Sequence, residues 1–461
     1  MIKKRALYKH QREAFKKTKG EANALFLDMR LGKTLICIRR CLTYKPLSAE
    51  NGLKFLIVAP NSAIGSWEDD LAEEGVKYCR LLGTSKQRWD LMSQALTCKD
   101  AMFILTNRES YRSIGDYFLR WTWDAVVLDE SHFVKNPKAK VTKFYLKYFR
   151  TVPHRWILTG TPSPESDTEW FCQMAFLYDS FMGCDSFWHW RAKYLRPGYS
   201  GHGWIPKKGV TVSIQRALAD KAIIMRRKDV GMDVPRTTMT RTIQLQPKIR
   251  KAYKKLENEF ILEIEGKEIA DTMWAGAKFQ LLRQVCSGRL TTGEDIHNGK
   301  RKEILELITN NLKNDPVIVW CCYRQEIEDV QKLFKKAKRK ADVIHGGIKP
   351  AQREVVRRKF MSGGLDALIL QYQTAEAGMC LSRSDTNIYF TEPPGYLAWS
   401  QTRDRVLDIH QKTPILDISL VVENSVDSDL HDTLKIKSLR NDLNFNEILK
   451  QQMHKRRREN G

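Results

Sequence analysis

The sequence predicts an α/β protein in which two parallel-sheet lobes are joined by a mainly helical middle region. Short apolar runs that end in polar, Gly or Pro residues alternate with amphipathic stretches, which is the pattern of βαβ units. This alternation occurs twice, over residues 23–161 and again over 315–422. Between them, at about 165–300, an aromatic-rich stretch is followed by a long charged stretch with helical period. Parallel strands of this kind are covered by helices on both faces, so each half is expected to build its own lobe.

Ten apolar runs are expected to be the buried strands, and they lie at 23–29, 54–60, 102–107, 124–130, 155–161, 315–323, 341–347, 366–372, 386–392 and 414–422. The domain boundaries that follow are 1–225 for the first lobe, with a helical insertion at about 165–225, then 226–299 for a helical linker or protrusion, and 300–461 for the second lobe with its basic tail. The Trp and Phe residues at 170–190 are expected to be core rather than a base-stacking platform.

The balance of charge indicates a nucleic-acid partner. The 461 residues carry 78 Lys and Arg against 54 Asp and Glu, a net charge of +24. Because binding to phosphates releases counterions, such an excess favours a polyanion over an indifferent basic surface. The basic run at 333–342 and the KRRR tail are typical of solvated helix faces, with contact to DNA phosphates as the alternative.

Cysteine usage and hydropathy indicate a reduced, cytoplasmic protein. The ten Cys form no CxxC pair and no Cys/His cluster with zinc spacing, so no structural zinc is expected. The N-terminus MIKKRALYKHQREAFKK lacks the apolar core of a signal peptide, and no run approaches the roughly 18 apolar residues of a membrane span. We expect a monomer in the cytoplasm, or in the host cytoplasm if the protein is viral, with no membrane partner.

The stretch LDMRLGKTLI at 27–36 has the composition of a phosphate-binding loop between a strand and a helix. Gly32 would let the backbone approach a phosphate, Lys33 would reach the β- and γ-phosphates, and Thr34 could hold Mg²⁺. The match is partial, because a full GxxxxGK[ST] motif would have Gly at the position of Leu27. A Gly-Lys-Thr triplet also occurs by chance, so the strand and helix around it carry much of this prediction.

Two further strand ends offer reactive or polar side chains. VVLDESH at 126–132 delivers Asp129 and Glu130 to the carboxyl end of a strand, where open α/β sheets bind ligands. Asp129 would hold Mg²⁺ and Glu130 would orient or activate the attacking water. The alternative for this motif is an ordinary helix N-cap. LTGTP at 158–162 forms a rigid turn with two hydroxyls, for which the alternative is a turn without function.

The ordered series LYKHQ, MRLGKT, FLIVAPNSAIGSW, DESHFVKNPKAK, LTGTP, MRRKDV, LLRQVCSG, HGG, QTAEAGMCL and QTRDRVLDIHQK resembles the Swi/Snf-type ATPases of helicase superfamily two. The resemblance covers residues 7 to about 437, and the compact length resembles phage and bacterial members. It implies a P-loop NTPase of two RecA-like lobes with ATP between them. It also implies an ATPase that DNA stimulates and that moves along a duplex or along one of its strands.

The resemblance also implies residue roles. Gln11 would read adenine, and Arg405 with Gln401 would act from the second lobe, with Arg405 as an arginine finger. His132 and Thr159 would couple the nucleotide to the DNA side. The nucleotide-binding set is Gln11, Arg30, Leu31, Gly32, Lys33, Thr34 and Gly378. The DNA-binding set, which would contact the backbone without reading bases, is Ser62, Ser66, Trp67, Thr106, Asn107, Gln373 and Thr374.

The sequence departs from the family pattern at three places. Arg30 stands where most relatives have Gly, and SPESD at 163–167 replaces a polar Gln-Asn-Asn segment. The third is Asp408, which stands where the family has its second finger arginine. On a continuous helix Gln401, Arg405 and Asp408 would share one face, whereas Arg403 would point away and could substitute only if the segment were irregular.

These patterns predict an ATP- and Mg²⁺-dependent DNA translocase or helicase that acts on duplex, forked or branched DNA, in replication, recombination or repair. Two alternatives stay open. Asp408 could mark an ATP-binding DNA switch with weak or absent hydrolysis, because a carboxylate repels the charge that develops on phosphate. An RNA-dependent ATPase of the same superfamily is the other.

Overall fold

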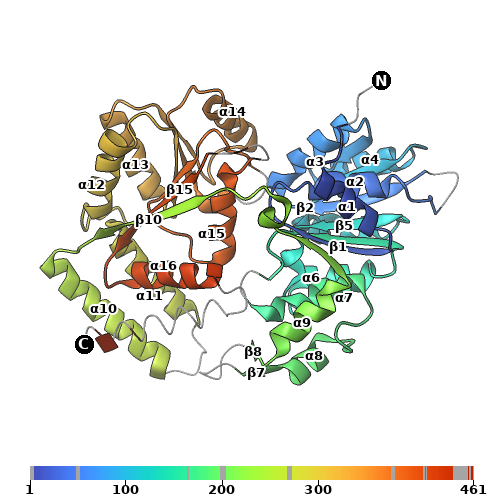
Figure 1. Cartoon of the computed structure of the whole chain (residues 1–461), viewed down its shortest axis with the longest axis horizontal. Helices are drawn as coiled ribbons and strands as arrows, with labels where there is room; N and C mark the ends of the chain where they lie inside the picture. The colour runs from blue at the N-terminus through green and yellow to red at the C-terminus, as the bar shows by residue number, and fades with distance from the viewer. Residues whose placement is uncertain are drawn as a thin grey trace. The chain divides into compact units, whose positions relative to one another are not determined.

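The computed structural model describes residues 5–47, 52–163, 166–197, 204–266, 272–374, 379–408, 411, 413–439, 455, 458 and 459, without the side chains of 260–275. The chain divides into two compact units (Figure 1). The first comprises Met1–Asp233 with Ala377–Met379, and the second comprises Val234–Glu376 with Cys380–Gly461. Each unit is built on its own parallel sheet, as the sequence predicts.

The first unit contains a seven-stranded sheet in the order β3-β4-β2-β5-β6-β1-β9, and all neighbouring strands are parallel. The five apolar runs of this half are confirmed as strands. Two edge strands, β3 and β9, were not predicted, because an edge strand has one neighbour and needs no long apolar run. The strands are β1 (Ala22–Leu27), β2 (Lys54–Ala59), β3 (Lys77–Arg80), β4 (Met102–Asn107), β5 (Ala125–Asp129), β6 (His154–Leu158) and β9 (Ala222–Met225).

Alternate side chains of these strands enter two separate cores, one on each face of the sheet. On β2, for example, Phe55 and Ile57 pack on one face while Leu56 and Val58 pack on the other. The first face is covered by α1 (Lys9–Lys17), α2 (Lys33–Cys41) and α3 (Asn61–Glu73). The second is covered by α4 (Ser85–Leu96), α5 (Tyr111–Phe118), α6 (Lys140–Tyr148), α7 (Trp170–Leu177), α8 (Phe187–Tyr194) and α9 (Val210–Ala219).

The stretch between β6 and β9 carries α7, α8, α9 and a small antiparallel pair, β7 (Leu195–Pro197) and β8 (Trp204–Pro206). Phe171 and Trp190 are buried in the core of the unit, so the prediction of core aromatics at 170–190 is confirmed for them. Trp188 differs, since 48% of its surface is exposed.

The second unit contains a six-stranded parallel sheet in the order β10-β15-β14-β11-β13-β12. The five apolar runs of this half are confirmed. The range 226–299 was expected to be helical, but it includes β10, which pairs with β15 along its whole length. Its sequence RTTMTRTI lacks an apolar run because it lies at the sheet edge. The strands are β10 (Arg236–Ile243), β11 (Val317–Cys321), β12 (Ala341–Ile344), β13 (Ala367–Gln371), β14 (Thr386–Tyr389) and β15 (Ile415–Val422).

The helical stretch predicted at 246–286 is confirmed as α10 and α11. Among the described residues, no helix combines the length and apolar character that a membrane crossing requires. The helices of this unit are α10 (Pro247–Gly266), α11 (Thr272–Ser287), α12 (Gly299–Glu306), α13 (Arg324–Lys336), α14 (Pro350–Met361), α15 (Tyr396–Arg403) and α16 (Val426–Leu439).

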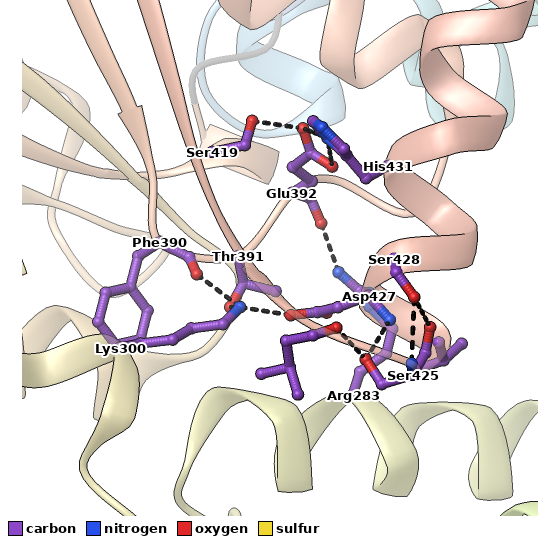
Figure 2. Close-up of polar contacts among 12 residues, drawn as sticks. Arg283, Lys300, Phe390, Thr391, Glu392, Ser419, Ser425, Asp427, Ser428 and His431 are labelled. Carbon is purple, nitrogen blue, oxygen red and sulfur yellow. Dashed lines mark hydrogen bonds and ion pairs between the residues drawn. The ribbon is translucent and has the colours of Figure 1, made fainter. Parts of the chain in front are cut away.

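A buried polar network connects α11, α12 and α16 to the carboxyl end of the second sheet (Figure 2). The Lys300 ammonium on α12 lies 2.6 Å from Asp427 Oδ2 on α16. His431, also on α16, lies 3.0 Å from Glu392 Oε1 beyond β14, and Arg283 on α11 donates to the carbonyl oxygen of Glu392. Because every one of these groups is buried, each charge depends on its partner in place of water.

Candidate active site

The loop between β1 and α2 has the backbone that a phosphate cradle needs. Gly32 caps α2 in the left-handed conformation with φ 85°, and a Cβ there would lie only 2.2 Å from Gln11 Nε2. Glycine is therefore required at this position. The helix opens with Lys33 and Thr34, so its free N–H groups and the Thr34 hydroxyl lie at the carboxyl end of β1. Arg30 is also left-handed, with φ 67°, which explains why glycine would suit this position.

Lys33 lies between the loop and the LTGTP turn. Its ammonium donates to the carbonyl oxygen of Leu27 at 2.8 Å. A Cβ on Gly160 would lie 3.7 Å from Lys33 Nζ and 3.3 Å from the oxygen of Leu27. The two motifs are brought together because β1 and β6 are neighbours in the sheet. The donor set of lysine, hydroxyl and helix N–H groups fits a nucleotide triphosphate.

Asp129 ends β5 and is held by two hydrogen bonds. Its Oδ2 accepts from the indole N–H of Trp67 at 2.9 Å, and its Oδ1 accepts from the backbone N–H of Glu130 at 2.9 Å. Burial and the neighbouring Glu130 carboxylate raise the pKa of Asp129 to about 6, although Trp67 and Lys33 act to lower it. A buried carboxylate that lies within electrostatic reach of Lys33 has the chemistry of a Mg²⁺ ligand.

Trp67 was predicted as a DNA-binding residue, and the structure gives it a different place. It lies on the buried side of α3 and is 1% exposed. Its polar atom is committed to Asp129. The sequence pattern FLIVAPNSAIGSW shows only that this Trp follows a strand, not which side of α3 it occupies. We therefore assign Trp67 to positioning Asp129.

Glu130 is connected to both predicted coupling residues. Its backbone is left-handed, with φ 50°. The Thr159 hydroxyl donates to Glu130 Oε2 at 3.0 Å and accepts from the N–H of Thr161 at 3.0 Å. His132 Nδ1 lies 3.5 Å from the same Oε2. Burial lowers the pKa of His132 to about 4, so its imidazole is neutral at pH 7. A carboxylate held in this way can orient a water molecule by accepting its proton.

Gln11 supports the loop from α1. It is 1% exposed, its Oε1 accepts from the N–H of Tyr8 at 3.1 Å, and its Nε2 donates to the carbonyl oxygen of Leu31 at 3.3 Å. His10 Nε2 lies 3.2 Å from the same oxygen of Leu31. These contacts give Gln11 a role in shaping the loop, beside the adenine recognition that the resemblance implies.

The predicted DNA-binding residues of the first unit lie at the carboxyl ends of β2 and β4, which are neighbours. Ser62 is exposed in the first turn of α3, and Ser66 is half-buried one turn later. Asn107 donates to Asn61 Oδ1 at 2.9 Å. Thr106 is 1% exposed, so its hydroxyl points inward and not to a ligand. The first three offer short polar groups at one edge of the sheet.

In the second unit, Gln373 and Thr374 lie in a 3-10 turn, Tyr372–Thr374, that follows β13. Gln373 is exposed and lines a cavity of about 470 Å³ together with Arg324 and Gln371. The Thr374 hydroxyl donates to the carbonyl oxygen of Gln371 at 2.8 Å, which shapes the turn. Gly378 lies outside the described residues.

The predicted finger segment is not one continuous helix. α15 carries Gln401 and ends at Arg403, a 3-10 turn spans Asp404–Val406, and the chain is extended at Leu407. The spacing predicts that Asp408 shares a helical face with Gln401 and Arg405. The structure shows no such shared face, because the helix ends before Asp408. Arg405 is 1% exposed.

Arg403 and Asp408 both have structural partners. Arg403 Nε donates to the buried carboxylate of Asp417 at 2.7 Å, which fastens α15 onto β15. Asp408 Oδ2 accepts from the Ser382 hydroxyl at 3.1 Å.

Comparison with known proteins places this geometry in a family. A family model described as the SNF2-related domain matches residues 11–289, and one described as the helicase conserved C-terminal domain matches residues 299–410. The chain belongs to the SNF2-related family. Both the resemblance drawn from the sequence motifs and the predicted fold of two parallel-sheet lobes are thereby confirmed.

Individual relatives of this SNF2-related chain are distant. The TATA-binding protein-associated factor MOT1 of Saccharomyces cerevisiae is 25% identical over 89% of this chain and 26% of its own length. The ATP-dependent helicase brm of Drosophila melanogaster is 24% identical over 87% of this chain and 26% of its own. The chain thus spans about a quarter of these relatives.

Two other similar proteins are closer in length to this SNF2-related chain. The putative protein p41 of Acyrthosiphon pisum secondary endosymbiont phage 1 is 25% identical over 68% of this chain and 71% of its own. The Sulfolobus solfataricus SWI2/SNF2 ATPase core in complex with dsDNA is 19% identical, covers 97% of this chain and 95% of its own, and has a TM-score of 0.45.

Sequence reasoning missed residues that fasten the motifs of this SNF2-related core to one another. Gln173 on α7 accepts from the Ser131 hydroxyl at 2.8 Å and donates to the carbonyl oxygen of Pro162 at 2.6 Å, which joins the DESH and LTGTP motifs. Asp28 accepts from Arg226 Nη1 at 3.0 Å and from the N–H of Arg227 at 2.9 Å, which joins MRRKDV to β1. Of these contacts, the sequence offered a signal only for the second, since MRRKDV carries the positive charges and LDMR the acidic Asp28.

Proposed function

We propose that this SNF2-related chain hydrolyses ATP with Mg²⁺ and uses the energy to move along duplex, forked or branched DNA. The observation that carries the proposal is the joint placement of two motifs. The N-terminus of α2, with Lys33 and Thr34, lies within electrostatic reach of Asp129, and Glu130 follows directly. A phosphate cradle beside two carboxylates, one of them fixed by an indole N–H, supports phosphoryl transfer better than simple anion binding.

Each residue has a defined task in this proposal. Lys33 and the N-terminal N–H groups of α2 bind the β- and γ-phosphates, and Thr34 with Asp129 holds Mg²⁺. Bound Mg²⁺ would neutralise charge on the phosphate oxygens. Glu130 accepts a proton from the attacking water. Gln11, Arg30, Leu31 and Gly32 shape the nucleotide pocket.

DNA contact is proposed from charge and from the choice of side chains. The net charge of +24 favours a polyanion. Ser62, Ser66, Asn107 and Gln373 offer short polar groups at the carboxyl ends of parallel strands, where a backbone can be bound without reading bases. The connection of Glu130 to Thr159 and His132 offers a path by which such a contact reaches the nucleotide.

The test is the steady-state ATPase rate without nucleic acid and with duplex, single-stranded and forked DNA and RNA. We expect DNA to raise the rate and Lys33→Ala to remove it, because Lys33 binds the transferred phosphate. A rate that no DNA changes would overturn the proposal. Nucleotide-dependent DNA binding without turnover would favour the ATP-binding switch, and stimulation by RNA alone would favour the RNA-dependent ATPase.

We also propose that Arg405 acts as the arginine finger and that Gln401 assists it. Removing such a finger costs about 10³-fold or more in turnover, so Arg405→Ala should lose most activity. Because Arg405 is buried, circular dichroism and nucleotide binding must show that the variant is folded. Turnover near the unchanged rate in a folded Arg405→Ala variant would refute this assignment.

A further inference from the structure

One aromatic side chain of the first unit is not used by its core or by the proposed active site. α8 presents Phe187 and Trp190 to the core, while Trp188 lies on the opposite side of the helix and is 48% exposed. Figure 1 shows α8, β7 and β8 at the end of this unit away from α3 and α4. A single exposed apolar side chain needs no explanation by itself, so its surroundings decide.

Trp188 packs against a cation, Arg191, that also contacts a second indole, Trp204. The guanidinium carbon of Arg191 lies 4.6 Å from the ring centre of Trp188 and 4.2 Å from that of Trp204 on β8. Lys207 Nζ donates to the carbonyl oxygens of Ala192 and Lys193, at 3.0 and 2.9 Å, and so joins β8 to the end of α8. Arg191 therefore lies against both rings, and β8 is fastened to the helix that carries Trp188, which lowers the entropy lost when this surface binds a flat partner.

The exposed side chains at the end of α8, on β7 and just after β8 include four cations. Lys193, Arg196, Lys207 and Lys208 are exposed, and none of these four forms an ion pair with another residue that the structure describes. Asp185 is the acidic residue nearest in sequence to the ring, and it lies beside His189. Cations around an aromatic surface fit a polyanion whose units carry flat rings. In a duplex each base face is covered by its neighbours, so an unpaired base fits best.

We propose that Trp188, supported by Arg191 and Trp204, stacks an unpaired nucleobase, and that the surrounding lysines bind the phosphates on either side of it. We call Trp188, Arg191 and Trp204 the insertion platform. This deepens the proposed function, on which it rests, by naming DNA with a single-stranded segment, as at a fork, as the substrate. The expectation that the aromatic cluster at 170–190 is core therefore holds for its other members and not for this one.

The test compares single-stranded with duplex binding. Fluorescence anisotropy measures the dissociation constant of an oligothymidine of about 20 nucleotides, longer than the roughly 4–16 nucleotides that a single-strand-binding OB fold covers, and of a blunt duplex. We expect Trp188→Ala to weaken oligothymidine binding about tenfold, since one stacked base contributes that order of affinity, and to leave duplex binding unchanged. Trp188→Phe should keep most of the affinity. Val212→Ala on α9, which is also 48% exposed, is the matched control and should change neither.

A second measurement is independent of affinity. Irradiation of a bound oligonucleotide that carries 5-iodouracil should crosslink it to Trp188, which peptide mass spectrometry can locate. Equal loss of single-stranded and duplex binding in Trp188→Ala, no loss of either, or a dimer of the unaltered protein that Trp188→Ala dissociates would overturn the proposal. Duplex-stimulated ATPase should be unaltered in Trp188→Ala. If the unaltered protein shows no DNA-stimulated ATPase but the stacking result stands, the proposed function fails and the insertion platform does not.

Discussion

The substitution Trp67→Phe separates a positioning role from simple packing in the proposed active site. It removes the indole N–H that donates to Asp129 Oδ2 at 2.9 Å and keeps an aromatic ring in the same buried place. In this variant Asp129 loses the indole donor and keeps the backbone N–H of Glu130. Since the Trp67 hydrogen bond acts to lower the pKa of Asp129, its loss should raise that pKa further above about 6.

The size of the effect follows from the charge of the acceptor. A hydrogen bond to a charged group contributes about 1.5–3 kcal/mol, against about 0.5–1.5 kcal/mol for a neutral pair. Removing a residue that orients a metal ligand typically costs about 10–100-fold in metal affinity. We therefore expect Trp67→Phe to weaken Mg²⁺-dependent nucleotide binding at least tenfold, which is about 1.4 kcal/mol.

The chain offers a matched control in Trp156→Phe. Trp156 is also fully buried in the same unit, and its indole N–H donates to the Tyr44 hydroxyl at 3.0 Å, a neutral acceptor away from the motifs. Both substitutions leave a similar cavity, so the packing cost nearly cancels in the comparison. Binding of a fluorescent ADP analogue with Mg²⁺ and with EDTA, together with urea unfolding, measures both effects.

The two variants should lose comparable stability, with Trp67→Phe lower by about 1 kcal/mol because its acceptor is charged. Only Trp67→Phe should lose the part of nucleotide binding that requires Mg²⁺. If both variants bind the nucleotide equally well in Mg²⁺, then Trp67 is a packing residue and its place in the proposed site is wrong.

Three other predictions concern single features of the structure. Arg30 has a left-handed backbone, with φ 67°, which only glycine adopts without strain. The free energy of unfolding of Arg30→Gly should therefore be about 1 kcal/mol higher than that of Arg30→Ala, as measured by urea unfolding of both variants. Burial lowers the pKa of His132 to about 4, so the unfolded chain binds more protons than the folded chain between that pH and about 6.5. The free energy of unfolding should therefore fall by up to about 3 kcal/mol as the pH drops through this window. His132→Asn should flatten this pH dependence, and equal pH profiles for the two proteins would contradict the prediction. Lys300→Met should lower the free energy of unfolding by about 3–5 kcal/mol, because it leaves the buried carboxylate of Asp427 without its cation. The double variant Lys300→Met with Asp427→Leu should recover much of this loss. Hydrogen exchange in α16 measures both, and additive losses would show that the pair is not coupled.

The fold could be predicted where burial dictates composition. Central strands such as β2 and β5 are covered on both faces, so all their residues but one terminal residue each are apolar and they stand out in the sequence. β10 has neither property, because it lies at an edge and six of its eight residues are Arg or Thr. Its identity depends on pairing with β15, more than 170 residues away, as in Arg236 with Ile415. No local pattern contains that information.

The candidate site divides in the same way. Asp129 ends an apolar strand, Thr159 directly follows one, and Lys33 follows one after a short loop, so local sequence predicts that parallel strands gather them at one edge. Trp67 contacts Asp129 from α3, which follows β2, and Gln173 contacts Ser131 from α7, which follows β6. Which side of a helix meets which strand is decided by tertiary packing, and that is why their roles could not be predicted.

Asp408 shows how a spacing argument depends on the element that it assumes. Charge alone predicted that a carboxylate at a finger position would oppose catalysis, provided that the helix of Gln401 continued through it. The helix ends at Arg403, and Asp408 instead accepts from Ser382 while its backbone N–H donates to Gln411 Oε1 at 3.2 Å. A carboxylate is suited to this turn because it accepts the hydroxyl proton, which an arginine cannot do. The carboxylate of Asp408 therefore has a local partner in Ser382, and Arg405 remains the proposed finger.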